Sequence, residues 1–222
     1  MELLEGISTR GSVRDFRPDP IRRETLESIL RAAGRSPSRS NTQPWEVAVV
    51  SGEKKERLSS ILYEMASSGA KPSPDLPSPA NWPPALDRRA KEHYAKRFGV
   101  AGAGPEDEKR RKESHLLNFR FHGAPCVMFL FTDSASGAAS IFDMGLFAQS
   151  IVLAAHSFNL GSCIQASAAR YPDAVREFLG MPKTKSLLVA ISIGYPNVEA
   201  QAAASRSSRI GTGEFAKWYD KA

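Results

Sequence analysis

Residues 140–162, SIFDMGLFAQSIVLAAHSFNLGS, form the most hydrophobic stretch of the chain and limit how the rest can be arranged. Apolar side chains recur on nearly every side of a helix drawn from this stretch, with Asp143 and Gln149 as isolated polar positions. A helix that is apolar all round has to be covered on all sides, because any open face would leave apolar surface in water. We therefore expect a central, buried helix that ends near residues 159–161, with Asp143 and Gln149 bonded to buried backbone groups.

Segments of strand and helix character alternate on both sides of this central helix. Short apolar runs bounded by turn residues predict buried strands, at residues 46–51, 124–133 and 186–196. Apolar residues at helical spacing predict amphipathic helices, at residues 20–36, 53–68 and 173–182. This order indicates an α/β or α+β domain, and we treat residues 1–222 as one domain.

Residues 71–113 differ in composition from both flanks. The first part is crowded with proline and serine, which excludes a regular helix or a central strand there, and charged helical segments follow at residues 87–98 and 105–119. We interpret residues 71–113 as a lid inserted into the domain, because neither flank looks complete alone. A pair of solvated surface helices is the alternative. The tail from residue 197 has no clear period and is expected to form an arm.

The charge balance narrows the possible partners. The net charge is +6, yet the basic residues are scattered among acids instead of forming the dense block that nucleic-acid binding favours. A basic cleft that attracts phosphorylated or carboxylated small molecules explains the excess equally well. We expect a small-molecule partner and no nucleic acid.

The compartment follows from the termini, the apolar runs and the cysteines. The N-terminus MELLEGIS carries acid where a secretory signal carries lysine or arginine. No uninterrupted apolar run approaches the roughly 20 residues of a membrane span, so we expect no membrane segment. Cys126 and Cys163 suit a reduced compartment and form no disulfide framework, and the histidines lack paired metal spacing. We expect a cytoplasmic protein without a metal.

Near the N-terminus, STRGSVRDF places Arg10, Ser12 and Arg14 at alternating positions. An extended backbone puts these three side chains on one face. Two guanidiniums and a hydroxyl there suit a phosphate, which arginine grips with a bidentate fork. The spacing permits an anion site, and a solvated strand is the plain alternative.

Further motifs follow this segment in a fixed order. They are PSRSNTQPW at residues 37–45, NFRFHGAP at 118–125, DMGLFAQSIVLAA at 143–155 and IGYP at 193–196, with Arg206 and Arg209 beyond them. Together these motifs resemble the nitroreductase-like family of FMN-dependent oxidoreductases over nearly the whole chain. The resemblance implies an α+β fold, a three-layer α-β-α sandwich whose central, mostly antiparallel sheet is flanked by helices. It also implies an intertwined homodimer.

The resemblance also implies which residues hold FMN. The N-terminal segment matches the part that binds the phosphate and the polar ring edge, and residues 37–41 match the segment by which the partner subunit covers the cofactor. Residues 164–167 match the turn beside the isoalloxazine, where the Ala166 amide is the candidate donor to flavin N5. The expected cofactor-binding residues are Arg10, Gly11, Ser12, Arg14, Pro37, Ser38, Arg39, Asn41, Ile164, Gln165, Ala166, Ser167, Arg206 and Arg209.

The function implied is an FMN-dependent NAD(P)H oxidoreductase, with NADH or NADPH as reductant. Hydride would pass to flavin N5 in a ping-pong cycle and then to an acceptor such as a nitroaromatic or a quinone, with no catalytic side chain. Ser40, and Arg89 and Arg97 of the lid, are the expected substrate contacts. A flavin-dependent reductive dehalogenase, or a non-catalytic module that binds anions or nucleic acid, is the alternative. A yellow purified protein would favour the flavoenzyme.

Overall fold

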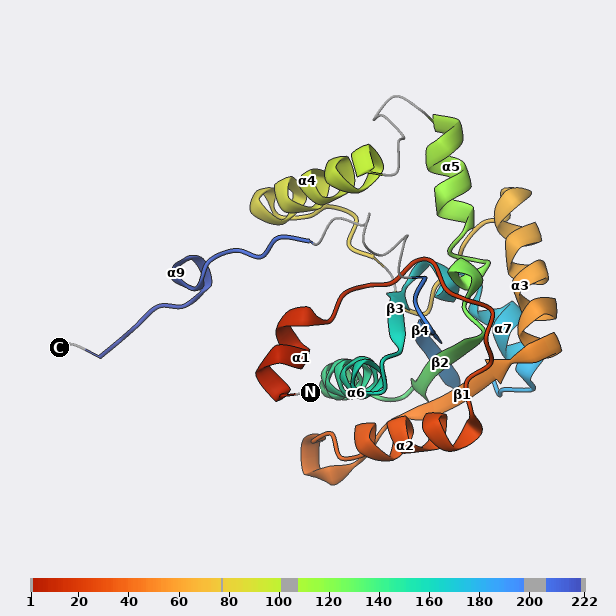
Figure 1. Ribbon diagram of the computed structural model, residues 1–222, viewed down its shortest axis with the longest axis horizontal. Coiled ribbons are helices and arrows are strands. Elements are labelled where there is room, and N and C mark those ends of the chain that lie inside the picture. The colour runs from red at the N-terminus through yellow and green to blue at the C-terminus, as the bar shows by residue number, and fades with distance from the viewer. Residues whose placement is uncertain (1, 77, 101–107, 198–206, 221–222) are drawn as a thin grey trace.

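One antiparallel sheet organises the chain. The computed structural model describes residues 2–76, 78–100, 108–197 and 207–220 (Figure 1). The strand order is β1-β2-β4-β3, and each neighbouring pair runs antiparallel. The strands are β1 (Glu46–Ser51), β2 (Cys126–Asp133), β3 (Gly161–Gln165) and β4 (Lys185–Gly194).

Helices cover both faces of this sheet. Side chains of β2 alternate between the two faces, so Val127 and Phe129 join one apolar cluster while Met128 and Leu130 join the other. The first cluster is closed by α3 (Gly52–Ser67) and α7 (Pro172–Leu179), and the second by α2 (Arg23–Ala33) and α6 (Ala138–Ser157). The predicted three-layer α-β-α sandwich is confirmed.

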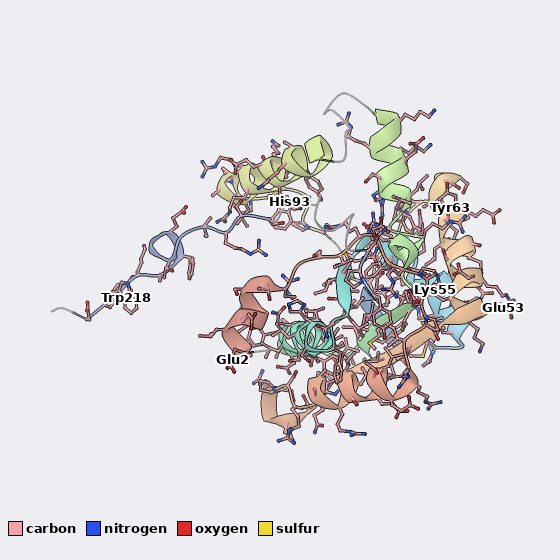
Figure 2. All side chains as sticks on the ribbon, in the orientation of Figure 1. Glu2, Glu53, Lys55, Tyr63, His93 and Trp218 are labelled. Atoms are coloured by element: carbon pink, nitrogen blue, oxygen red, sulfur yellow. The ribbon has the colours of Figure 1, made fainter. Side chains whose placement is uncertain are left out.

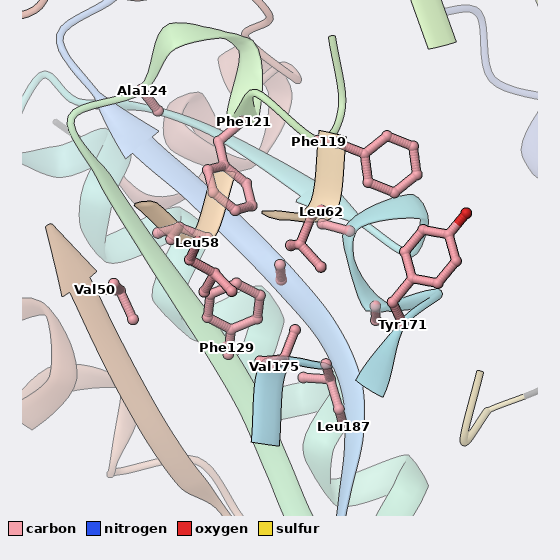
Figure 3. Packing of buried hydrophobic residues seen from close by; sticks show 14 of the residues in the cluster. Val50, Leu58, Leu62, Phe119, Phe121, Ala124, Phe129, Tyr171, Val175 and Leu187 are labelled. Carbon is pink, nitrogen blue, oxygen red and sulfur yellow. The ribbon is translucent and has the colours of Figure 1, made fainter. Parts of the chain in front are cut away.

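The cluster under α3 is rich in aromatic rings. Phe129 and Phe121 meet edge to face with ring centroids 5.9 Å apart, and both are fully buried. Figure 3 shows Leu58 and Leu62 of α3 packed over them, with Val175 of α7 nearby. Edge-to-face rings at this separation stabilise the fold by more than the burial of their apolar area alone, so this cluster stabilises the packing of helices on β2 and β4.

The central hydrophobic helix is α6, and it lies in the core of the second cluster. Phe147 stacks on Trp45 with ring centroids 4.8 Å apart, and Ile151 and Val152 are buried against the sheet. Against the expectation that no segment is long enough, α6 is long and apolar enough to cross a membrane by length and composition alone. Its seven buried positions instead lie on the side that packs on α2 and the sheet. The expectation that the helix is covered on all sides is wrong for the single chain, because Ile141 and Phe142 on the other side are 38% and 68% exposed.

The element boundaries follow local chemistry in most places. Helix α2 ends at Gly34, as predicted, and α6 ends at Ser157, slightly before the predicted end. Two of the longer elements among the described residues were not predicted. They are α1 (Leu3–Thr9), whose Leu3 and Leu4 are exposed, and β3, whose sequence GSCIQ is short.

Three helices lie in the insertion and in the C-terminal tail. The segment expected to form a lid contains α4 (Pro84–Val100) and α5 (Glu108–Leu116), so helices occur where they were predicted. None of the described side chains of α4 is buried. The tail carries a short helix, α9 (Thr212–Phe215), and residues 207–220 run away from the layered body as an arm (Figure 1).

Candidate functional site

The N-terminal segment lies along the outer edge of β3. The backbone amide of Val13 donates to the carbonyl of Ser162 at 2.9 Å, and Ser12 forms a bridge with Ser162. Val13 and Phe16 are 6% and 7% exposed, so they anchor this segment to the core. Ser12 and Arg14 flank the buried Val13 and are exposed, which leaves their polar groups free to face a ligand.

Two glycines allow the close approach of this segment. A Cβ atom at Gly161 would stand 2.7 Å from a methyl carbon of Val13, and one at Gly194 would stand 2.9 Å from the ring of Phe16. Any larger residue would push the N-terminal segment off the sheet edge. Gly161 and Gly194 therefore fix the place of the Arg10–Arg14 motif, although neither glycine was among the predicted site residues.

A cleft of about 360 Å³ opens where the N-terminal segment, the end of α6, the start of β3 and the residues after β4 meet. On one wall the Thr9 hydroxyl lies 2.9 Å from Nε2 of His156. The lining residues are Arg10, Gly11, Val13, Arg17, His156, Asn159, Leu160, Gly161, Ser162, Tyr195 and Pro196. Of the predicted cofactor residues, the cleft brings together Arg10 and Gly11, while Ser12 and Arg14 lie outside its lining.

At the other end of β3, the predicted flavin turn presents alternating faces. Ile164 is 43% exposed and Ala166 is exposed, whereas Gln165 between them is buried. The side chain of Gln165 points into the protein and bonds to Asn118 and Ser192. The turn therefore offers an apolar side chain and backbone groups to a ligand, and the Gln165 amide serves the interior.

The predicted partner-covering loop, residues 37–41, is held by α6. The backbone amide of Arg39 donates to the Asp143 carboxylate at 3.1 Å, and Ser36 donates to Ser150 at 2.7 Å. Asp143 thus bonds to a backbone group, as predicted, whereas Gln149 is exposed, so the same prediction for Gln149 is wrong. Ser40 and Asn41 take left-handed backbone angles, with φ of 52° and 57°, and Arg39, Ser40 and Asn41 are exposed, so the loop is turned outward. No residue of this loop lines the cleft at Arg10.

Arg10 and Arg14, two of the cations expected at the site, are available for a ligand. Within the described residues, neither Arg10 nor Arg14 forms an ion pair. Arg209 on the arm is exposed and donates to the carbonyls of Ser207 and Ser208. Arg206 lies outside the described residues. Arg89 on α4 is half-buried, and the side chain of Arg97 is outside the described part.

Comparison with known proteins identifies the family to which this chain belongs. The family model described as "Nitroreductase family" matches residues 7–195, which spans the edge motif, the sheet and α6. The chain belongs to the nitroreductase family. The resemblance drawn from the motifs is therefore confirmed.

Individual nitroreductases match over nearly the whole chain. Nitroreductase NfnB of Mycolicibacterium smegmatis is 34% identical, with 96% of this chain and 90% of that protein covered. A 4-nitrobenzoate reductase of Pseudomonas putida is 33% identical, with 91% and 89% covered. Among solved structures, the FMN-dependent nitroreductase NfnB from Mycobacterium smegmatis in complex with NADPH superposes with a TM-score of 0.92, at 32% identity and 97% and 96% coverage.

Proposed function

We propose that this nitroreductase-family protein is an FMN-dependent NAD(P)H oxidoreductase that reduces nitroaromatic acceptors. The observation that carries the proposal is the edge of β3, where the exposed Arg10–Arg14 motif lies at one end and the exposed Ile164–Ala166 turn at the other. The relatives add weight, since one is a 4-nitrobenzoate reductase and one was solved as an FMN-dependent enzyme in complex with NADPH.

The groups along this edge fit the parts of FMN. A phosphate dianion needs cations and N–H donors, and Arg10 and Arg14 are exposed or half-exposed with no ion pair among the described residues. A flat ring needs an apolar wall, which the exposed Ile164 side chain can supply. The polar ring edge needs donors, and the Ala166 amide is our candidate for flavin N5. Arg206 and Arg209 are proposed to close on the phosphate.

When bound, FMN supplies the redox chemistry, accepting hydride from the nicotinamide and passing it to the acceptor. The chain's own residues bind FMN, orient the nicotinamide and the acceptor against it, and exclude water from the site. Reductant and acceptor are proposed to occupy the same face in turn, which is a ping-pong order. Cations beside the ring lower the energy of negative charge that gathers there, and Arg14 is proposed for that role. No side chain has to transfer a proton in this scheme.

A homodimer completes the proposed site. The loop at residues 37–41 is turned outward and does not line the cleft at Arg10 in its own chain, so we propose that it covers the cofactor of the partner subunit. The exposed aromatic residues of the arm also support a dimer. Phe215, Trp218 and Tyr219 are all largely exposed, and Figure 2 places Trp218 far from the layered body. A two-fold dimer would bury this surface and supply two equivalent sites.

The proposal also covers the role of the lid and the compartment in which the protein works. Helix α4 has no buried described side chain, which suits a helix that covers a ligand or the partner subunit. Its Arg89 and Arg97, together with Ser40 of the loop, are the proposed acceptor contacts. Cys126 and Cys163 are both buried and form no disulfide within the described residues, as a reduced compartment allows, and burial raises the pKa of the Cys126 thiol to about 12. We propose that the enzyme works in the cytoplasm.

Arg10→Ala tests the cofactor assignment. We expect a folded protein whose Kd for FMN rises about tenfold to a hundredfold, because a phosphate loses a charge-assisted hydrogen bond. Equilibrium dialysis measures the change, and Arg31→Ala, an exposed arginine in the last turn of α2, is the matched control. Unchanged affinity in Arg10→Ala rejects the phosphate role. A wild-type protein that is colourless and cannot be reconstituted with FMN rejects the function.

A further inference from the structure

The amide of Gln165 is the best-bonded buried side chain beside the proposed flavin turn. Gln165 is 3% exposed, and its Nε2 donates to the carbonyl of Asn118 at 3.1 Å and approaches the Asn118 Oδ1 at 3.4 Å. The hydroxyl of Ser192 in β4, itself fully buried, donates to the Gln165 Oε1. A buried amide loses free energy for each bond it lacks, so these partners fix the orientation of the side chain.

Asn118 is the point where the charged insertion returns to the sheet. It follows α5 by two residues, and its own side chain donates to the carbonyl of His115 at 2.8 Å. His115 in turn meets Arg170, with 3.0 Å between the ring Nε2 and the guanidinium NH1. Two bonds therefore join residues 115–118 to the chain segment that follows β3.

The entry of the insertion reaches the same segment. The backbone amide of Ser73 donates to the carbonyl of Arg170 at 3.1 Å, and the hydroxyl of Tyr171 donates to the carbonyl of Ala70 at 3.1 Å. Both ends of the insertion, 45 residues apart between Ser73 and Asn118, thus meet on residues 165–171. That segment begins at the turn which, under the proposed function, lies beside the flavin.

We propose that Gln165 is a positioning residue that fixes the flavin turn and the exit of the lid relative to each other, and so sets the shape of the acceptor side of the site. This inference rests on the proposed function. Ile164 and Ala166 face the ligand while Gln165, between them, faces the lid exit, so a shift of Asn118 moves the turn by way of one side chain. The role is to hold geometry and not to touch the reacting atoms.

The physical argument gives the direction of the effect. Loss of the Gln165 amide leaves the Asn118 carbonyl and the Ser192 hydroxyl without their partner, and the lid exit loses its bond to β3. FMN affinity should fall less than acceptor affinity, because the proposed phosphate ligands Arg10 and Arg209 lie elsewhere and only the Ala166 amide of the loosened turn bears on the flavin. Acceptor binding should weaken, because the turn at residues 164–166 and the lid exit, which together form the acceptor side of the proposed site, are no longer held together.

Gln165→Met is the test variant, since methionine has a similar length and makes neither bond. Ser192→Ala is the matched control, because it removes the Ser192 bond and keeps the bond to Asn118. We expect both variants to unfold at lower urea. Hydrogen exchange of residues 114–119 should be about fivefold faster in Gln165→Met, the factor expected for one lost hydrogen bond, and unchanged in Ser192→Ala.

The steady-state comparison completes the test, with 4-nitrobenzoate as the acceptor. In Gln165→Met we expect the acceptor KM to rise about fivefold to tenfold while kcat and the Kd for FMN change less than about threefold. Ser192→Ala should keep the wild-type KM. The proposal is overturned if exchange at the lid exit is unchanged in Gln165→Met, or if both variants shift KM equally.

A second variant covers the case in which Gln165→Met does not fold. Arg170→Ala removes the exposed contact with His115 without opening a cavity in the core, and it should speed exchange at residues 114–119 in the same direction. Unchanged exchange there overturns the proposal. Exchange is recorded with and without FMN, so it decides the link even if the protein binds no flavin. Failure to bind FMN rejects the proposed function and, with it, the effect on acceptor KM.

Discussion

The layered body and the segments that leave it bury their apolar groups to very different degrees. In the body, every residue of β2 from Cys126 to Thr132 is buried between two helical layers. On the C-terminal arm, Trp218 and Tyr219 are 81% and 89% exposed, and α4 buries none of its described side chains. The core of the body is therefore buried by contacts within one chain. The arm and α4 carry side chains whose burial needs a second surface, which we propose to be the partner subunit and the bound ligands.

The largest effect is expected inside the body. Phe129→Ala removes a fully buried ring that packs on Phe121 and Leu58, and it should lower the free energy of unfolding by about 3–5 kcal/mol. Urea denaturation followed by circular dichroism measures this loss. Phe158→Ala is the matched control, because this half-exposed phenylalanine follows α6 and its removal should cost under about 1 kcal/mol. Equal losses in the two variants would break the contrast between buried and exposed rings.

The next effect is expected where the insertion leaves the body. Arg176 of α7 is buried and binds Asp75 and Asp173, and Asp75 also accepts from the backbone amide of Leu187 at 2.8 Å. Burial acts against its charged form, but hydrogen bonds to the two carboxylates outweigh burial, so the pKa of Arg176 is raised. Arg176→Ala leaves Asp75 poorly paired and should lower the free energy of unfolding by about 2–3 kcal/mol.

The exposed ion pair in α2 serves as the control for this prediction. Arg23→Ala breaks the pair between Arg23 and Glu27, which lies in solvent, and the urea midpoint should stay at the wild-type value. If Arg176→Ala were as harmless as Arg23→Ala, the anchor at Asp75 would be a surface contact, and the insertion would not be tied to the body there.

The arm gives the third prediction, which concerns assembly and not folding. Trp218→Ala/Tyr219→Ala should raise the Kd of the proposed homodimer about thirtyfold, since aromatic anchors dominate the energy of interfaces. The unfolding of the body should change little, because neither ring touches its core in the single chain. Sedimentation velocity over a dilution series measures the Kd, and Lys217→Ala on the same arm is the control. A wild-type protein that sediments as a 24.2 kDa monomer at all concentrations contradicts the dimer.

The smallest effect is expected on α4. If the lid faces the flavin, its arginines attract an acidic acceptor, so a nitrobenzoate should have a higher kcat/KM than nitrobenzene at low ionic strength. Arg89→Ala/Arg97→Ala should reduce this ratio about threefold, and salt should reduce it in the wild type. Lys91→Ala, whose amine pairs with Asp87 at 2.7 Å, is the control. A ratio that is the same in the double variant would mean that the charge of α4 serves solubility alone.

Long, strongly patterned elements could be predicted from the sequence. The strand at residues 46–51 begins and ends where it was predicted, and the α3 and α7 helices follow their apolar spacing closely. Helix α6 was predicted at the right place in the chain and packs on α2 and the sheet, but it is covered on one side only, because Phe142 is 68% exposed in the single chain. These predictions succeed because local propensity, periodicity and burial agree in those segments.

Short elements and contacts could not be predicted in the same way. Strand β3 has only five residues, and it begins with a glycine and ends with a buried glutamine, so its sequence has no clear strand pattern. It forms a strand because it pairs with β4. The alternation of Arg10, Ser12 and Arg14 permitted an anion site, with a solvated strand as the alternative. Their position beside β3 depends on Val13 and Phe16 fitting over Gly161 and Gly194.

The sequence by itself determined the family, the alternation of helices and strands, and the residue types that a phosphate and a flat ring require. The tertiary structure decided that Gln165 turns inward to Asn118 while Ile164 and Ala166 face outward, and that residues 37–41 lie outside the cleft of their own chain. The physical reason is that helix and strand patterns arise from neighbours in the chain, whereas these contacts join residues tens of positions apart. Their partners are set by how the layers pack, and that packing is fixed when the whole chain folds.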